Sequence, residues 1–134
     1  MSVRVNDRKE GHLQVLNCSL NLAVYTLQVC KNEKVFPKSQ RWIMAQRLVN
    51  ECLDAVTCIR RANATMVKDP ESKAYRHGQQ IEAHAHINAF MSLLEIAHRA
   101  FSIETRRIEY WTKLATDTND KLVGWMKSDK ERFN

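Results

Sequence analysis

The sequence predicts an all-α protein that folds as an antiparallel up-down-up-down four-helix bundle. Its 134 residues include only three Gly and two Pro, fewer than proteins built from strands and tight turns use. The chain also has four stretches in which apolar residues recur every three or four positions, which is the spacing of one helix face. Four such faces of similar length, joined by short connections, bury one another in a bundle.

The first helix is expected from Leu13, after a polar arm. Its predicted buried seam is Leu13, Leu16, Leu20, Ala23, Leu27 and Cys30. A polar stretch then breaks the pattern, and Pro37 ends it because the residue before a proline avoids the α region. The second helix is expected to begin near Lys38. Its seam is Ala45, Leu48, Cys52, Ala55, Ile59 and Ala62.

The third helix is expected from Pro70 to Phe101, because Asp69 is a favourable N-cap and proline suits the first helical position. Its seam is Ala83, Ile87, Phe90, Leu94, Ala97 and Phe101. Its first half carries few apolar residues, so we expect this half to project beyond the core or the helix to begin later than Pro70.

Ser102 is expected to cap the fourth helix, with Glu104 in the first turn, where the helix dipole favours an acid. The predicted seam is Ile108, Trp111, Ala115, Thr118, Leu122 and Trp125. The chain is therefore interpreted as one bundle over residues 12–128. A flexible N-terminal arm over residues 1–11 and a flexible C-terminal tail over residues 129–134 complete the expected organisation.

Net charge favours polyanionic partners. The formal charge is +6 and the pI about 9.3, as in many nucleic-acid-binding domains, although a positive charge also serves solubility. In an up-down bundle the first and third connections meet at one end, which would gather Lys31, Lys34, Lys38, Arg41, Arg99, Arg106 and Arg107. The opposite end would gather Arg60, Arg61, Lys68, Lys73 and Arg76. Both groups are predicted to contact phosphates.

No constellation of residues predicts catalysis, a cofactor or a metal site. The four cysteines form no C-x-x-C pair and fall at or near core positions, which favours small buried side chains in a reducing compartment. With no signal peptide and no apolar run approaching a membrane span, a soluble cytoplasmic protein without membrane contact is expected. A histidine-based metal site is the alternative, built from His84, His86 or His98 with Glu95. Because only one Glu-x-x-His pair occurs, solvated or interface histidines are favoured.

Two motifs carry a family resemblance. Residues 35–41 read VFPKSQR and are followed by Gln46-Arg47-Leu48, and residues 121–127 read KLVGWMK. In order and spacing they resemble the accessory variability (Avd) proteins of diversity-generating retroelements, which are similar to four-helix-bundle proteins of ribosomal intervening sequences. The resemblance covers roughly residues 15–127. The family often has a second glycine where this chain has Val123, and a third helix rich in histidines is not a family feature.

The resemblance implies a non-catalytic accessory factor. Such proteins form basic homopentamers that bind a partner reverse transcriptase and template RNA or an RNA–DNA hybrid, and so support mutagenic cDNA synthesis. It implies polar contacts for Lys38, Arg41 and Arg47. It also carries over Lys127 from the second motif, without a specific role. Structural roles are implied for Phe36, Pro37, Gly124 and Trp125. The alternative is a protein–protein interaction bundle that does not bind nucleic acid.

Overall fold

A computed structural model describes the backbone of residues 5–134 and the side chains of residues 11–40 and 43–134. The helices are α1 (Val5–Cys30), α2 (Gln46–Ala64), α3 (Pro70–Phe101) and α4 (Thr105–Arg132). Over the described residues no strand occurs, which confirms the expected all-α class.

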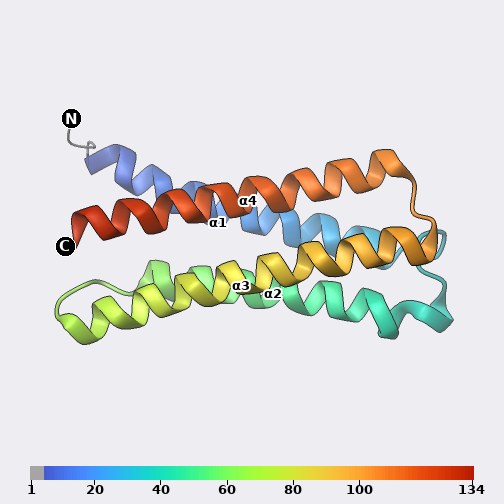
Figure 1. The fold of residues 1–134 in the computed structure, drawn as a ribbon, viewed down its shortest axis with the longest axis horizontal. Coiled ribbons are helices and arrows are strands. Elements are labelled where there is room, and N and C mark those ends of the chain that lie inside the picture. Colours follow the sequence, from blue (N-terminus) through green and yellow to red (C-terminus); the bar gives the residue numbers. More distant parts are fainter. Residues whose placement is uncertain (1–4) are drawn as a thin grey trace.

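The four helices form a ring in which α1 packs against α2 and α4, and α3 packs against the same two helices. Each helix runs back along the one before it (Figure 1). The α1–α2 and α3–α4 connections consequently lie together at what we call the two-loop end. The α2–α3 connection lies at the other end, here called the one-loop end, beside the C-terminus.

The entrance to α2 is irregular. A 3-10 turn over Lys38–Gln40 leads into a π-helical segment over Arg41–Ala45, and α2 continues from there. Helical structure thus begins at Lys38, as expected. Phe36 anchors this entrance, because its side chain is fully buried and its ring packs edge-on against Phe101 at 5.3 Å.

The start of α3 follows the prediction. The Asp69 carboxylate accepts a hydrogen bond from the Ser72 backbone N–H at 2.7 Å, and the Ser72 hydroxyl accepts one from the Asp69 N–H at 3.1 Å. This capping box satisfies donors that the first turn leaves free, and Pro70 needs none. The hydrogen bonds from Ser72 also lower the pKa of Asp69.

The predicted role of Ser102 is wrong. Its φ of 51° places it in the left-handed region, where it ends α3 instead of capping α4. The chain then turns inward, because Ile103 is buried, and α4 begins at Thr105 with Glu104 at its N-cap position. The acid expected in the first turn therefore lies just before it.

The predicted seams of α2, α3 and α4 are buried, with Phe101 and Ile108 only partly so. Two of these seams run further than predicted. Arg76 and Gln80 extend the buried face of α3 toward its N-terminus, so its first half does not project from the core. At the other terminus, α4 continues to Arg132 where a flexible tail was expected, and Asp129 extends its inner face.

The predicted seam of α1 is wrong at Leu13, Leu20 and Leu27, whereas Ala23 and Cys30 are buried as predicted and Leu16 is partly buried. The buried positions are Val15, Ser19, Leu22, Ala23, Thr26, Val29 and Cys30. Ser19 and Thr26 fit the core because each hydroxyl donates a 2.7 Å hydrogen bond to a carbonyl of the preceding turn. The helix also begins at Val5, within the segment expected to be a flexible arm. The side chains of residues 1–10 lie outside the described residues.

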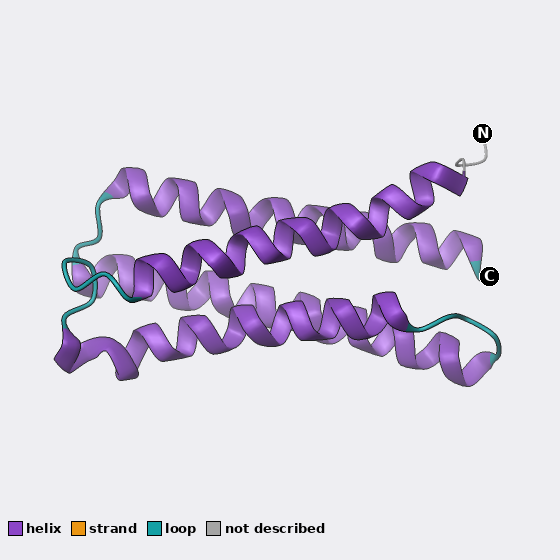
Figure 2. Ribbon diagram, turned by 180° about the vertical axis from the view of Figure 1, so that it is seen from behind, coloured by secondary structure: helices purple, strands orange, loops and turns teal. Residues whose placement is uncertain are grey.

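The exposed face of α1 is apolar as well. Leu13, Leu20 and Leu27 are 60%, 44% and 45% exposed. The segment Gly11–Cys30 is long and apolar enough to cross a membrane by length and composition, with a mean hydropathy of 1.2, contrary to the sequence-based expectation. A helix that packs into a bundle core meets the same criteria, and α1 buries its other face in this way. Figure 2 shows α1 lying along the other helices of the bundle.

Candidate nucleic-acid interface

The two-loop end brings together cations from three segments. Lys31, Lys34 and Lys38 lie in the α1–α2 connection, Arg99 ends α3, and Arg106 and Arg107 begin α4 (Figure 1). All are exposed except Arg107, which is partly buried. The structure therefore places these predicted residues at one end of the bundle.

Acidic side chains balance part of this group. Lys38 lies 3.7 Å from Glu33, and Arg99 lies 2.6 Å from Glu95, four residues before it on α3. Both pairs are largely exposed, so their ion pairs are weak and each cation can exchange its partner for a phosphate. Arg47 is exposed in the first turn of α2, next to this end. The side chains of Arg41 and Trp42 lie outside the described residues.

Tyr110 is a candidate interface residue that the sequence analysis missed. Its side chain is 52% exposed although it is aromatic, and its ring packs edge-on against Tyr25 at 4.9 Å. Tyr110 lies three and four residues after Arg107 and Arg106, so the three side chains share one face of α4. The three- and four-residue spacing from Arg107 and Arg106 to Tyr110 is the feature of the sequence that could have identified Tyr110. An oriented aromatic ring beside cations is the arrangement on which unpaired bases stack.

The one-loop end also differs from its prediction. Arg60, Arg61, Lys68 and Lys73 are exposed there, whereas Arg76 is buried and is not available to a phosphate. The C-terminal turns of α4 add three exposed cations that were assigned to a tail or to a short motif: Lys127, Lys130 and Arg132.

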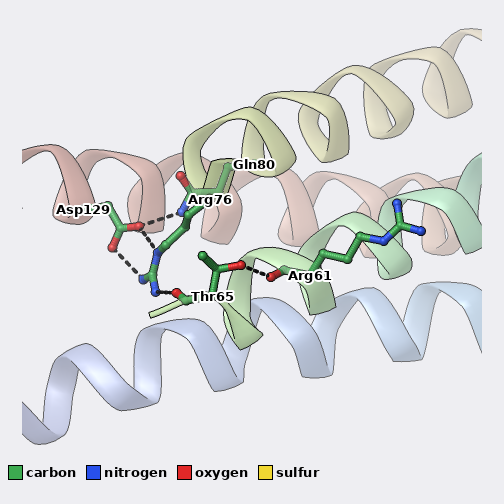
Figure 3. A network of polar contacts seen from close by, with 5 residues as sticks. All are labelled: Arg61, Thr65, Arg76, Gln80 and Asp129. Atoms are coloured by element: carbon green, nitrogen blue, oxygen red, sulfur yellow. Dashed lines mark hydrogen bonds and ion pairs between the residues drawn. The ribbon is translucent and has the colours of Figure 1, made fainter. Parts of the chain in front are cut away.

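Arg76 instead holds α3 to α4. Its Nε and Nη2 donate to the two carboxylate oxygens of Asp129 at 2.6 and 2.9 Å, and its Nη1 donates to the Thr65 carbonyl at 3.2 Å (Figure 3). Gln80 Nε2 donates to the same carboxylate at 2.9 Å. The Arg61 side chain extends away from this network, while its carbonyl accepts the Thr65 hydroxyl at 2.7 Å.

Aromatic rings enclose the buried guanidinium. Its carbon lies 5.1 Å from the ring centre of Trp125 and 5.5 Å from that of Phe133. His12 of α1 packs edge-on against Trp125 at 5.6 Å. Burial lowers the pKa of His12, and the positive charge of Arg76 acts in the same direction. An open pocket of about 380 Å³ adjoins this network, with Lys73 and Lys130 among its walls.

The two motifs that carry the family resemblance contain both buried and exposed residues. Phe36 and Trp125 are buried, in agreement with their structural roles, and Lys127 is exposed. Pro37 and Gly124 are exposed, and a Cβ added at Gly124 would meet no atom within 4 Å. Packing within this chain therefore does not require glycine at position 124.

The histidines of α3 contact neighbouring helices one at a time. His86 Nδ1 lies 2.6 Å from Glu51 Oε2, and His84 Nδ1 lies 2.8 Å from Asn119 Oδ1. The Glu95 side chain is directed to Arg99. Over the described residues, no three side chains among His, Cys, Asp and Glu converge on a common point where a metal ion could bind.

The environment of each cysteine favours the protonated thiol. Burial raises the pKa of all four, to about 12 for Cys30 and Cys52. A nucleophilic cysteine requires a lowered pKa and an exposed sulfur. The region that the structure describes accordingly offers no activated thiol.

We expect Cys30 and Cys52 to resist alkylation by iodoacetamide at pH 8 in the folded protein, because both thiols are buried and protonated. In denaturant all four cysteines should be labelled. Mass spectrometry of the peptides measures both states. Rapid labelling of Cys52 without denaturant would contradict its placement.

Comparison of the chain with models of known families, with curated proteins and with solved structures finds no match.

Proposed function

We propose that this protein is a non-catalytic, oligomeric accessory factor that binds template RNA or an RNA–DNA hybrid and a partner reverse transcriptase, as the resemblance to the Avd family implies. In that role it supports cDNA synthesis whose chemistry belongs to the partner. The proposal includes a cytoplasmic homopentamer that uses no cofactor and does not bind a membrane.

The observation that carries the proposal is the basic two-loop end. Cations from three separate segments share this end, and two of the acids near it, Glu33 and Glu95, form exposed pairs that phosphates can replace. Arg106 and Arg107 supply charge on the same helix face as the exposed ring of Tyr110. Backbone contact and base stacking are the two components of single-strand recognition.

The first test is the salt dependence of RNA binding. We expect the double variant Lys34→Ala/Arg106→Ala to reduce the slope of log K against log salt by about 0.7 for each contact with single-stranded RNA that is lost. Fluorescence anisotropy with a labelled RNA between 50 and 300 mM KCl measures the slope. Lys121→Ala removes an exposed cation from the same helix, about 22 Å along α4 from Arg106, and should leave most of the slope in place. Equal effects of both variants, or no binding at low salt, would contradict the proposed interface.

If a base stacks on Tyr110, removing the ring should lower the RNA affinity without changing its salt dependence. Tyr110→Ala should weaken binding of unpaired RNA by about 1–3 kcal/mol, because one base loses its aromatic platform. The salt slope should stay unchanged, since no cation is removed. Tyr110→Phe keeps the ring and should bind like the unmodified protein. Full affinity in Tyr110→Ala would exclude a role for this ring.

A further inference from the structure

The exposed surface of α1 lacks charge. From Gly11 to Cys30 the chain has no Asp, Glu, Lys or Arg. With 27% charged residues overall, 20 positions would carry about five. Only one side of this segment is buried, so core packing explains the apolar residues of that side and leaves the other unexplained.

The exposed apolar side chains of α1 form a stripe. Leu13, Leu20 and Leu27 recur every seven residues, and Val24 is 53% exposed beside them. From Leu13 to Leu27 the stripe is about 21 Å long, at about 1.5 Å per residue. Near its start, Leu13, Leu16 and Leu20 line a shallow groove of about 450 Å³.

This stripe borders α2. The other side of α1 meets α4, because Tyr25 packs against Tyr110 and the charges of Asp117 and Lys121 act on Cys18. On α2, the exposed residues Gln46, Asn50, Leu53 and Thr57 are also uncharged and are spaced by four, three and four residues. Arg60 and Arg61 follow Thr57 on the same helix face, so the uncharged surface of α2 ends at Thr57. Figure 2 looks onto the side of the bundle that α1 and α2 form. We call this surface the uncharged face.

We infer that the uncharged face is the surface through which copies of this chain associate with one another. The inference rests on the proposed function for the existence of an oligomer and adds the surface that joins its protomers. Chains of charge +6 repel one another. An extended surface without cations is therefore a place where a second copy can approach closely.

The chemistry of the face favours a second copy over a lipid surface. Uncharged amides lie beside the leucines, at Gln14, Asn17, Asn21 and Gln28 of α1. In hydrocarbon an amide without a hydrogen-bond partner is costly. Between two protein surfaces, amides can pair with each other or with water. The leucines at every seventh residue supply one of the two apolar positions of a coiled-coil heptad, while the other, at Leu16 and Ala23, packs within this chain. A contact between two copies would therefore join exposed helix faces without forming a coiled coil.

The experiment measures mass in solution without RNA. The unmodified protein should give a multiple of the monomer mass by light scattering at tens of micromolar. Leu13→Lys/Leu20→Lys introduces two charges at exposed positions and should give the monomer mass, with far-UV circular dichroism unchanged. Ile81→Lys/Ile96→Lys is the matched control on α3, where the replaced side chains are 48% and 52% exposed, and it should keep the oligomer.

Three outcomes would overturn the inference. One is a monomeric unmodified protein, including one that associates only with phosphatidylcholine vesicles or only with a different protein. Another is an oligomer that Leu13→Lys/Leu20→Lys leaves intact. The third is equal dissociation by the α3 control. A monomer that binds RNA in a salt-dependent way would contradict this inference and the homopentamer of the proposed function, and would leave the proposed RNA binding standing. An oligomer that the leucine variant separates, but that never binds RNA, would contradict the RNA binding of the proposed function and leave the inference standing.

Discussion

Replacing Asp129 by alanine should lower the free energy of unfolding by about 3–5 kcal/mol, because it leaves the buried Arg76 guanidinium without its counter-charge. Both side chains are shielded, with 7% of Arg76 and 12% of Asp129 exposed. The carboxylate accepts three hydrogen bonds, two from Arg76 and one from Gln80. Urea denaturation followed by circular dichroism at fixed protein concentration measures the loss.

The matched control is Asp117→Ala. Asp117 pairs with Lys113 at 2.9 Å on the same helix, but these side chains are 44% and 70% exposed, so the loss should not exceed about 0.5 kcal/mol. A second variant, Arg76→Met/Asp129→Leu, removes both charges and should recover most of the stability. Similar effects of Asp129→Ala and Asp117→Ala would show that the Arg76–Asp129 pair does not hold α3 to α4.

The spacing of apolar residues along the sequence correctly predicted the buried faces of three of the four helices. It succeeded where only one stripe of a helix is apolar, as along Leu48, Cys52 and Ile59 of α2. In α1 it failed because two apolar stripes compete. Leu13, Leu20 and Leu27 follow the same seven-residue repeat as Val15, Leu22 and Val29, and period alone does not say which stripe faces inward. Ser19 and Thr26 make the buried stripe less apolar than the exposed one, so the exposed stripe was predicted to face the core.

The polar ends of the seams could not be predicted from local sequence. Arg76 and Asp129 are 53 residues apart, and each alone reads as a solvated charge. Only the fold shows that they meet, and that Arg76 therefore leaves the predicted phosphate-binding group. The gathering of cations at the two-loop end did follow from the sequence, because the order of helices and connections determines which loops share an end. Tyr110 was missed because it lies between the seam positions Ile108 and Trp111, and only the seam positions of this helix were considered.

Replacing Trp111 by alanine should cost about 3–5 kcal/mol of unfolding free energy, since this fully buried tryptophan, the largest such side chain among the described residues, would leave a cavity in the core. Its ring centre lies 6.0 Å from those of Phe90 and Tyr25, and its Nε1 donates to Thr26 Oγ1 at 2.9 Å. Urea denaturation followed by circular dichroism measures the change. The m-value should stay constant if only stability changes.

Trp111→Phe separates volume from hydrogen bonding. It keeps most of the ring and loses the donor to Thr26, so its cost should be well below that of alanine. Trp111 immediately follows Tyr110 on α4, and it fixes the turn that presents Tyr110 and Arg107 at the two-loop end. Under conditions where Trp111→Ala remains folded, its RNA affinity should therefore fall less than that of Tyr110→Ala. The reverse order would mean that the core residue, through the position of α4, controls the interface more strongly than the exposed ring.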